Sequence, residues 1–403
     1  MSKKRWLAIV GIGEDKLDGL TPAAQELIAQ AEFVVGGKRH LALAGPLAAE
    51  TMNWPSPIEN AVDVIEAHRG SSVCVLASGD PFFFGVGAML ARRFSADEMI
   101  SIPAPSAFAL AASRLGWSQQ DCALLTLHGR PLEAIIPHLQ PGARILALSW
   151  DDATPAKLAA LLTERHMGRS KLTICEAMGG LSERIRTTEA QHFALDNVAA
   201  LNTIALEVVA ERDARVLPRT AGLPEEWFEH DGQITKREIR AMTLSSLAPR
   251  RGELLWDVGS GSGSVAIEWM LADPTNSAVA IEVRHDRAER IARNALSFGV
   301  PRLSVAAGEA PQVFADLATP DAVFIGGGAS TPGMIERACD ALRAGGRLVV
   351  NAVTLERQAA CIDWRARWGG ELTQIAIAHA EPVGRYSGWR AAMPVVQWRF
   401  VKP

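Results

Sequence analysis

Short apolar runs alternate with amphipathic segments along almost the whole chain, and this alternation is interrupted only once. Runs typical of strands, such as Trp6–Val10 and Val73–Ser78, end at Gly, Pro or Asp. Segments with helical periodicity lie between them. One is Thr21–Ala31, where Thr21 is placed as N-cap and Pro22 occupies the first helical position. Strands that alternate with helices favour largely parallel sheets covered by helices, so the sequence predicts an α/β fold.

The same patterns predict most of the remaining elements. Helices are expected at Pro155–Arg165 and Lys236–Leu247, and the tail Ala391–Val401 alternates like an antiparallel edge strand. The further predicted strands are Leu124–Leu127, Ile145–Ser149, Leu172–Glu176, Leu254–Val258, Val279–Glu282, Leu303–Ala306, Ala322–Ile325 and Arg347–Asn351.

The interruption is the segment Glu211–Gly232, which contains Pro218, Pro224 and a polar run. The α/β alternation restarts after it. A chain of 403 residues is long enough for two or three domains. We therefore predict a linker at 211–232 between an N-terminal domain, 1–210, and a C-terminal domain, 233–403.

Charge and hydropathy exclude several classes of partner. The formal net charge of -4 leaves no overall basic footprint for nucleic acid, and no segment approaches the ~18 apolar residues of a membrane span. Lys3, Lys4 and Arg5 precede an apolar run as in a signal peptide, but Glu14 and Asp15 cut that run short. We expect a cytoplasmic protein that binds neither nucleic acid nor membrane.

The cysteines predict neither a disulfide framework nor a zinc site, because no CxxC pair occurs and none has a neighbour at ligand spacing. No metal site is predicted from the histidines either. We expect five buried apolar thiols at Cys74, Cys122, Cys175, Cys339 and Cys361.

A glycine-rich loop follows the predicted strand Leu254–Val258. Gly259, Gly261 and Gly263 are spaced G-x-G-x-G, and a helix follows them. Glycines there let the backbone approach a ligand, and the helix N-terminus offers free N–H groups. The dinucleotide spacing G-x-G-x-x-G fails, because the chain has Ser264 at the last position.

Two acids accompany this loop. Asp257 lies two residues before the first glycine, and Glu282 ends the next predicted strand, where a carboxylate can accept hydrogen bonds from both hydroxyls of a ribose. A turn that serves strand–helix packing alone would leave both acids unexplained. The loop resembles the first motif of class I S-adenosylmethionine (SAM) methyltransferases, which have a Rossmann-like fold. This resemblance implies cofactor binding by Thr235, Asp257, Gly259, Ser260, Gly261, Ser262, Gly263, Glu282, Glu309, Ala310 and Gly327.

Two later loops fit the same pocket. Gly308–Pro311 follows a strand at a place suited to contact with the adenine edge. Gly326–Gly328 follows another strand, where substrate would meet the methyl group, although a plain strand-to-helix turn is the alternative interpretation.

The N-terminal half has glycine loops of a different kind. Gly79 permits close backbone approach and Pro81 stiffens the turn, which holds Asp80 at the C-terminal end of a strand. Pro103–Ala107 and Leu127–Arg130 also follow strands. These segments resemble class III tetrapyrrole methylases, in which SAM lies between two α/β subdomains and is held mostly by backbone groups. The resemblance implies cofactor binding by Ser78, Gly79, Asp80, Pro81, Ser106, Ala107 and His128.

Two side-chain interpretations stay open in this half. His128 invites a general-base role, but a structural role at the strand end is favoured. Phe82–Phe84 is interpreted as core rather than as a stacking platform.

The order of the two halves is itself specific. Together they resemble the precorrin-6Y methyltransferase family of the CobL type, in which a CbiE-like class III half is fused to a CbiT-like class I half. Gly11–Leu20, Ser78–Gly85 and His128–Arg130 carry the first part of the resemblance, and Thr235–Glu268 with Gly308–Pro311 carry the second.

This resemblance implies two SAM-dependent C-methylations of a precorrin, at ring positions 5 and 15, with decarboxylation of the acetate at ring position 12, in cobalamin biosynthesis. By the same resemblance, the class I half is assigned the decarboxylation and the methylation at position 15, and the class III half the methylation at position 5. The resemblance also implies one SAM per half, two per chain, and a homo-oligomer is expected. No protein nucleophile is required, and no catalytic residue is assigned. The substrate is a polycarboxylate, metal-free or cobalt-containing, for which arginines are suited. Candidates by position are Arg130, Arg237, Arg385 and Arg390.

Two other functions are compatible with a SAM site. One is a class I methyltransferase that acts on RNA or protein, with the first domain used for recruitment. The net charge and the lack of a basic, aromatic-interleaved segment count against RNA. The other is a SAM-sensing regulatory protein without turnover, for which two complete sites would be redundant.

Overall fold

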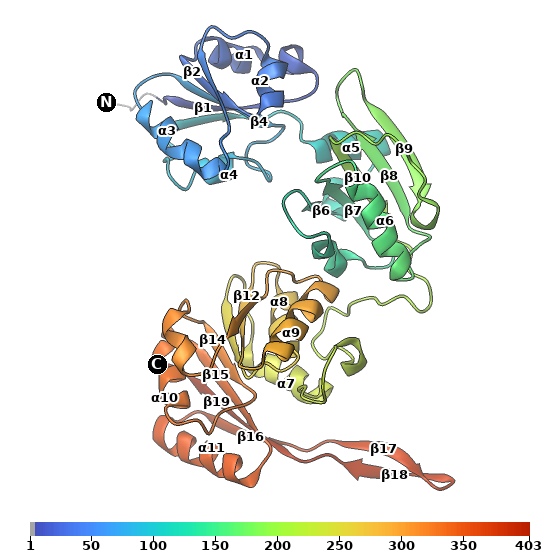
Figure 1. Cartoon of the computed structure of the whole chain (residues 1–403), viewed down its shortest axis with the longest axis vertical. Helices are drawn as coiled ribbons and strands as arrows, with labels where there is room; N and C mark the ends of the chain where they lie inside the picture. Colours follow the sequence, from blue (N-terminus) through green and yellow to red (C-terminus); the bar gives the residue numbers. More distant parts are fainter. Residues whose placement is uncertain (1–4) are drawn as a thin grey trace. The chain divides into compact units, whose positions relative to one another are not determined.

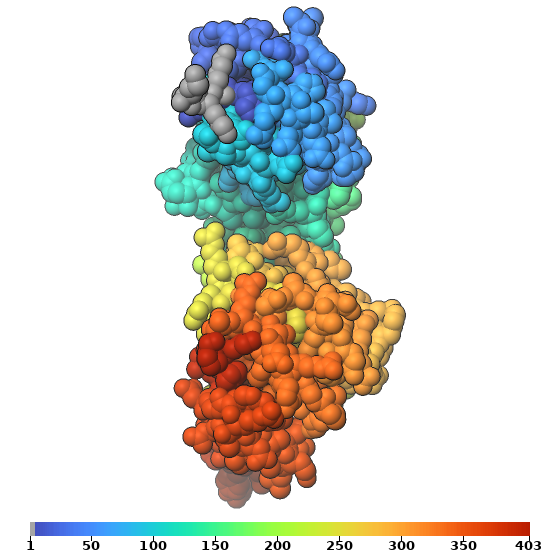
Figure 2. All heavy atoms as spheres, turned by 90° about the vertical axis from the view of Figure 1, so that its left-hand side faces the viewer, coloured from blue at the N-terminus to red at the C-terminus, as the bar shows by residue number. Residues whose placement is uncertain are grey.

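The computed structural model describes residues 5–403, so Lys3 and Lys4 lie outside the described residues. Contacts divide the chain into two compact units. The first runs up to Leu132 and from His138 to Val216, and the second contains Glu133–Pro137 and Leu217–Pro403. In Figure 1 the first unit is coloured blue to green and the second mainly yellow to red. Within each unit, side chains fill the gaps between the ribbons (Figure 2).

A fully parallel sheet begins the first unit. Its strand order is β3-β2-β4-β1-β5, so β1, β4 and β5 are adjacent and their C-terminal ends meet at one edge. Buried aliphatic side chains of β1 and β4 pack on both faces, as expected for a parallel sheet between helices. The elements are β1 Leu7–Ile12, α1 Pro22–Ala29, β2 Phe33–Gly36, α2 Lys38–Ala44, β3 Glu50–Asn53, α3 Ala61–Ala67, β4 Val73–Ser78, α4 Gly87–Leu90 and β5 Met99–Ile102.

The second sheet of this unit is mostly antiparallel, which the prediction of largely parallel strands did not anticipate. Its order is β6-β7-β10-β8-β9, and β6 with β7 is its parallel pair. Helix α5 packs on this sheet through Phe108 and Ala111. The elements are α5 Ala107–Leu115, β6 Cys122–Thr126, β7 Arg144–Leu148, α6 Thr154–Glu164, β8 Lys171–Glu176, β9 Arg184–Glu189 and β10 Asn202–Glu207.

The main sheet of the second unit has the order β13-β12-β11-β14-β15-β19-β16. After β11 the chain adds β12 and β13 on one side, then returns to add β14 and β15 on the other, all parallel. Ligands of such sheets bind at the carboxyl ends where the order reverses, here between β11 and β14. The elements are α7 Arg237–Leu247, β11 Leu254–Val258, α8 Ser264–Ala272, β12 Ser277–Glu282, α9 His285–Ser297, β13 Ser304–Ala307, β14 Ala322–Ile325, α10 Met334–Ala341, β15 Arg347–Ala352, α11 Leu355–Trp368, β16 Glu371–Ile375 and β19 Val395–Val401.

The C-terminal strand β19 corrects the prediction of an edge strand. It is antiparallel, as predicted, but pairs with β15 on one side and β16 on the other. Trp398 of β19 is fully buried, because both neighbouring strands and helix α11 cover it. A further hairpin, β17 Ala378–Val383 and β18 Tyr386–Ala391, extends beyond the sheet (Figure 1).

Much of the predicted linker is packed into the second unit. Leu217, Leu223 and Phe228 are each at most 5% exposed. The Glu268 carboxylate accepts backbone hydrogen bonds from Gly222 (2.7 Å) and Leu223 (2.9 Å), and Arg240 Nε donates to it at 2.6 Å. A buried ion pair with its remaining polar atoms satisfied fixes the surrounding chain. The division between the units thus falls between Val216 and Leu217, inside the predicted linker. Domain boundaries at 210 and 233 stay predictions.

Two smaller expectations can be compared with the described residues. All five cysteines are free thiols, and four are buried as predicted, whereas Cys122 is partly exposed at the start of β6. Among residues 5–403, none of the helices is both long and apolar enough to span a bilayer.

Candidate functional site

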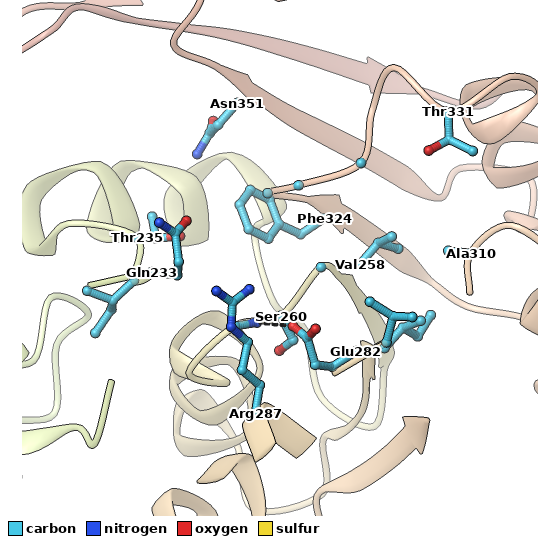
Figure 3. Close-up of a pocket in the computed structure, with 18 of the residues that line it drawn as sticks. Gln233, Thr235, Val258, Ser260, Glu282, Arg287, Ala310, Phe324, Thr331 and Asn351 are labelled. Atoms are coloured by element: carbon cyan, nitrogen blue, oxygen red, sulfur yellow. Dashed lines mark hydrogen bonds between the residues drawn. The ribbon is translucent and has the colours of Figure 1, made fainter. Parts of the chain in front are cut away.

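A cavity of about 540 Å³ opens at the carboxyl edge of the sheet in the second unit, where the strand order reverses. Loops after β11, β12, β13, β14 and β15 line it, together with the segment that precedes α7. Figure 3 shows Ser260 and Glu282 on one side of the group of lining residues, and Asn351 on another. The predicted site residues that line the cavity are Thr235, Gly259, Ser260, Gly261, Glu282, Glu309, Ala310 and Gly327.

The glycine loop after β11 passes close to the loop after β14. A Cβ on Gly259 would lie 3.1 Å from three backbone atoms of Gly327, tighter than side chains normally pack. Gly259 also has a φ of +68°, in the left-handed region that glycine adopts readily. The backbones of the two loops therefore lie in contact along the cavity wall, and a side chain at Gly259 would collide with Gly327.

Glu282 lies at the end of β12 and is 4% exposed. One carboxylate oxygen accepts from the Gly261 backbone N–H at 3.0 Å, and the other accepts from the Arg284 backbone N–H at 3.1 Å. A carboxylate has about four acceptor positions, so each oxygen can take a further hydrogen bond from a ligand. The backbone donors fix Glu282 in place for that purpose.

Three predicted residues support the loop instead of lining the cavity. Asp257 is 1% exposed and accepts from Ser260 Oγ at 2.7 Å and from the Ala266 backbone at 3.2 Å. Ser262 is fully buried, and its carbonyl accepts from Asn294 of α9 at 2.8 Å. Gly263 is the N-cap of α8, and a Cβ at this position would lie 2.9 Å from the Ile291 side chain. Their direct contact with a cofactor stays a prediction, but the structure gives all three a role in shaping the loop.

The cations of the cavity differ from those that the sequence suggested. Arg237, Arg385 and Arg390 do not line it, and Arg390 instead pairs with Glu381 on the hairpin at 2.9 Å. The lining cations are Lys236, Arg287 and Arg357. Sequence position alone missed these residues and Asn351, because they come from elements that only the folded sheet brings together.

The loops after β1, β4 and β5 meet at the carboxyl edge of the first sheet. The backbone N–H of Ala104 donates to the Gly79 carbonyl at 3.0 Å. A Cβ on Gly79 would lie 2.9 Å from Ser106 Cα. The absence of a side chain at Gly79 therefore lets the loops after β4 and β5 pack against each other, in addition to any contact with a ligand.

Side chains in these loops are held by local hydrogen bonds. Ser78 Oγ lies 2.7 Å from both Arg39 Nη2 and His40 Nε2 of helix α2, and Asp80 accepts from the Phe82 backbone at 2.9 Å. Ser106 caps α5 by accepting from the Ala109 backbone. Of the remaining predicted residues, Pro81 is buried in the loop and Ala107 is the first residue of α5. This edge brings together Ser78, Gly79, Asp80, Pro81, Ser106 and Ala107.

His128 lies in the second subdomain, in the loop after β6, and its ring is 6.2 Å from the Trp150 ring. The neighbouring Arg130 is placed over the Phe84 ring at 5.8 Å, so loops of the two subdomains approach each other here. His128 and Trp150 are both exposed. Among residues 5–403, the His128 ring forms no hydrogen bond. The structure therefore favours neither the general-base role nor the structural role.

The interpretation of Phe82–Phe84 as core is wrong. Their exposed fractions are 47%, 37% and 45%. Phe83 and Phe84 rest edge-on or tilted against the buried Phe108, with ring centroids 5.2 and 5.9 Å apart. The tight turn at Gly79–Pro81 directs these three rings onto the surface beside the loop, which leaves an apolar face next to the predicted site.

Comparison with known proteins covers both units. The family described as tetrapyrrole (corrin/porphyrin) methylases matches residues 7–194, and the family described as precorrin methyltransferase domain matches residues 226–402. A curated relative from Sinorhizobium sp, named precorrin-6Y C(5,15)-methyltransferase [decarboxylating], is 56% identical over 98% of this chain and 96% of its own. The chain belongs to the precorrin-6Y C(5,15)-methyltransferase family. It is a methyltransferase with a tetrapyrrole-methylase fold followed by a Rossmann-like fold.

A second curated relative agrees with this membership, and one solved structure is similar to part of the chain. A relative of the same name from Mycobacterium tuberculosis is 41% identical over 98% of this chain and all of its own. The crystal structure of the C-terminal domain of precorrin-6Y C5,15-methyltransferase from Rhodobacter capsulatus is 50% identical, covering 46% of this chain and all of that domain, with a TM-score of 0.44.

Precorrin-6Y C(5,15)-methyltransferases depend on SAM, and the cavity of the second unit fits this cofactor. Its volume is within the range of roughly 300–1,000 Å³ that small-molecule pockets occupy. Glu282 keeps acceptor positions for two ribose hydroxyls, and Gly259 and Gly261 leave the cavity wall open to a ligand. When bound, the cofactor supplies an activated methyl group.

Buried Asp257 gives this cofactor loop a pH-dependent stability. Burial raises the pKa of its carboxyl to about 6, with the nearby negative charge of Glu282 adding to the effect and the bonds from Ser260 and Ala266 opposing it. The folded state therefore binds the proton more tightly than the unfolded chain does, at a pKa of about 4. Stability falls as the pH rises through the interval from about 4 to about 6.

We expect Asp257→Asn to remove this loss of stability. Between about pH 5 and pH 7.5, the free energy of unfolding of the natural protein should fall by about 1–2 kcal/mol relative to that of the variant. Denaturant unfolding of both full-length proteins at each pH measures how the free energy of unfolding changes with pH in each of them. If the free energy of unfolding changes equally with pH in both proteins, ionisation of Asp257 does not destabilise the folded state.

Proposed function

We propose that this chain methylates a precorrin at ring positions 5 and 15 and decarboxylates the acetate at ring position 12, as a step of cobalamin biosynthesis. Its similarity over nearly the full length to relatives named for this reaction is the observation that carries the proposal. Both halves present loops at the carboxyl edge of an α/β sheet, where α/β enzymes bind their ligands.

We also propose one SAM site in each half, two per chain. The site of the second unit would be held by the glycine loop, Glu282, Ala310 and Gly327, which line one cavity. The site of the first unit would be held by the loops that meet around Gly79. The two sets share no residue, which is consistent with separate binding.

The residues that line the cavity can orient reactants and exclude water. Backbone donors hold Glu282 before any ligand arrives, so the ribose end of the cofactor would meet a fixed acceptor. Phe324, Met334 and Val353 supply apolar walls. The electron-rich carbons of a reduced macrocycle are themselves nucleophiles, which explains why no Ser/His or Cys/His pair is needed.

Lys236, Arg287 and Arg357 are the cavity-lining cations that suit a polycarboxylate substrate. Arg287 is already engaged with Asp231 at 2.9 Å, whereas Arg357 forms no ion pair within residues 5–403. Arg357 is therefore the cation most available to a substrate carboxylate. In the first unit, Arg130 and the exposed rings of Phe82–Phe84 offer a cationic and an apolar contact beside the predicted site.

Cytoplasmic location and homo-oligomeric assembly also stay proposals. The β17–β18 hairpin supports the second, since Val383, Tyr386 and Trp389 are each more than 60% exposed there. Exposed apolar patches of this kind often mark protein–protein contacts.

Mass spectrometry of the pigment formed from the reduced, hexamethylated precursor tests the function. With SAM carrying a labelled methyl group, we expect a product with two labelled methyl groups and one carbon dioxide less. Label in RNA or protein would support the recruitment alternative instead. A protein that binds SAM without transferring label to any acceptor would be a sensor.

A further inference from the structure

A chain of buried polar side chains ends at the cavity of the second unit. Asn351 at the end of β15 is 9% exposed and lines the cavity, and Gln397 of β19 pairs with it across the sheet at 3% exposure. Gln397 Nε2 donates to Asn351 Oδ1 at 2.9 Å, and Asn351 Nδ2 donates to Thr243 Oγ1 of α7 at 2.8 Å. Ser246 Oγ donates to Gln397 Oε1. Polar chains buried in this way hold a side chain in one orientation.

Each member of the chain fixes the direction of the next. Thr243 donates its hydroxyl proton to the Ile239 carbonyl at 2.7 Å, so its oxygen must accept from Asn351. Gln397 Oε1 is occupied by the Ser246 hydroxyl, so its nitrogen must face Asn351. Asn351 therefore keeps one N–H without a partner among the described residues, and this donor is available to a ligand in the cavity that Asn351 lines.

Asn351 lies on the opposite side of the cavity from Glu282. Glu282 ends β12 and Asn351 is the last residue but one of β15, with β11 and β14 between the two strands. Neighbouring strands lie about 4.8 Å apart, so the three spacings between β12 and β15 amount to roughly 14 Å. Figure 3 likewise shows Asn351 well apart from Glu282. Asn351 is thus a neutral donor on the far side of the cavity from the expected ribose acceptor.

Apolar side chains line the cavity together with Asn351. Ile239, Val395 and Val353 line the cavity with it, and Ile239 and Val395 belong to one buried cluster. Arg357 also lines the cavity, but it is partly exposed to solvent. A substrate carboxylate bound next to Asn351 would be held by a neutral group in a cavity that also has apolar walls.

Loss of carbon dioxide is favoured in such surroundings. The carbon–carbon bond to the carboxylate breaks, its electron pair passes into the conjugated macrocycle, and the methylene carbon takes a proton from water to become a methyl group. Because the carboxylate loses its negative charge, a strong ion pair would stabilise the starting state more than the transition state. A neutral donor can orient the carboxylate with less of this penalty.

We propose that Asn351 donates its free N–H to the substrate carboxylate that is lost, and that Gln397 acts as the positioning residue for this donor. The proposal rests on the proposed function and adds to it the group that selects and orients the acetate. It assigns Asn351 to the substrate and not to the cofactor.

The test uses Asn351→Leu, which removes the donor at similar volume. We expect decarboxylation to fall by about a hundredfold, because the carboxylate loses its partner in a site built to bind it. The affinity of the second unit for SAM and the methylation at ring position 5 should stay within about threefold of the natural protein. Asn276→Leu is the matched control, since Asn276 is 1% exposed in the same unit but lies outside the cavity.

Gln397→Glu provides a second, independent readout, which decides the question if Asn351→Leu does not fold. The protonated carboxyl group of this variant can donate to Asn351 as the Gln397 amide does, whereas the ionised carboxylate cannot. Decarboxylation by this variant should therefore approach the natural rate at low pH and fall as the pH rises, with a profile absent from the natural protein.

Unchanged decarboxylation in Asn351→Leu would overturn the proposal, as would equal losses in Asn351→Leu and Asn276→Leu. A flat pH profile for Gln397→Glu relative to the natural protein would also overturn it. If the natural protein itself forms no decarboxylated pigment, the proposed function fails, and that result is distinct from failure of the Asn351 assignment.

Discussion

Methylation at ring position 5 is expected to fall by about a hundredfold or more when Gly79 is replaced by valine. Gly79 has a φ of +54°, and a Cβ there would lie 2.9 Å from Ser106 Cα and 3.0 Å from the Pro105 carbonyl oxygen. Both contacts are with backbone, which cannot rotate away. The two loops must separate, and displacements near 1 Å in a reacting site cost about a hundredfold in rate.

SAM binding and product analysis together measure this effect. The natural protein should bind two SAM molecules per chain, and Gly79→Val should bind one. Methylation at ring position 15 and decarboxylation should persist, because the second unit contains none of the affected loops. Normal methylation at position 5 by this variant would show that the Gly79 loop is not the cofactor site.

Gly116→Val is the matched control for this experiment. Gly116 ends α5 with a φ of +64°, and nothing lies within 4 Å of the Cβ that valine would add. Gly116→Val places valine in the same left-handed backbone region as Gly79→Val, at a cost of about 1–2 kcal/mol, but the added side chain collides with nothing. Activity at position 5 should be retained in the folded control.

Replacement of Glu282 with alanine is expected to weaken SAM binding in the second unit by about ten- to a hundredfold. Hydrogen bonds to a charged group contribute about 1.5–3 kcal/mol each, and water replaces part of that contribution. The Gly261 N–H also loses its acceptor, which loosens the glycine loop. Isothermal titration with SAM resolves the two sites by their affinities.

The affinity of the first unit should not change, since it shares no residue with the Glu282 site. At limiting SAM the Glu282→Ala variant should accumulate a macrocycle that is methylated once and still carries its acetate carboxylate. Glu289→Ala serves as control, because Glu289 is an exposed carboxylate on α9 outside the cavity. Equal loss of both methylations in Glu282→Ala would mean that the halves do not act as independent sites.

The sequence determined the local features of both halves. Buried strands such as Leu254–Val258 were predicted with the bounds that the structure shows, because a short apolar run between breaking residues favours one conformation. The helix cap at Thr21 was likewise predicted and is observed, since it depends on neighbouring residues alone. The lining positions Gly259, Gly261 and Glu282 followed from their spacing along one strand–loop–helix–strand unit.

Only the tertiary structure decided how distant segments combine. Strand β19 alternates like an edge strand, yet it lies between β15 and β16, because pairing depends on which edges the rest of the sheet leaves open. The run Phe82–Phe84 is apolar but exposed, since its turn directs it away from both cores.

The cavity-lining side chains that come from distant elements show the same limit most clearly. Arg287, Asn351 and Arg357 line the cavity from three separate elements, and Gln397 orients Asn351 from 46 positions further along the chain. Local spacing contains no signal for such a set, because its members meet only when β15 and β19 pair and α7 packs on them. Local sequence therefore determined the glycine loop that lines the cavity, and the packing of the sheet decided which side chains surround that loop.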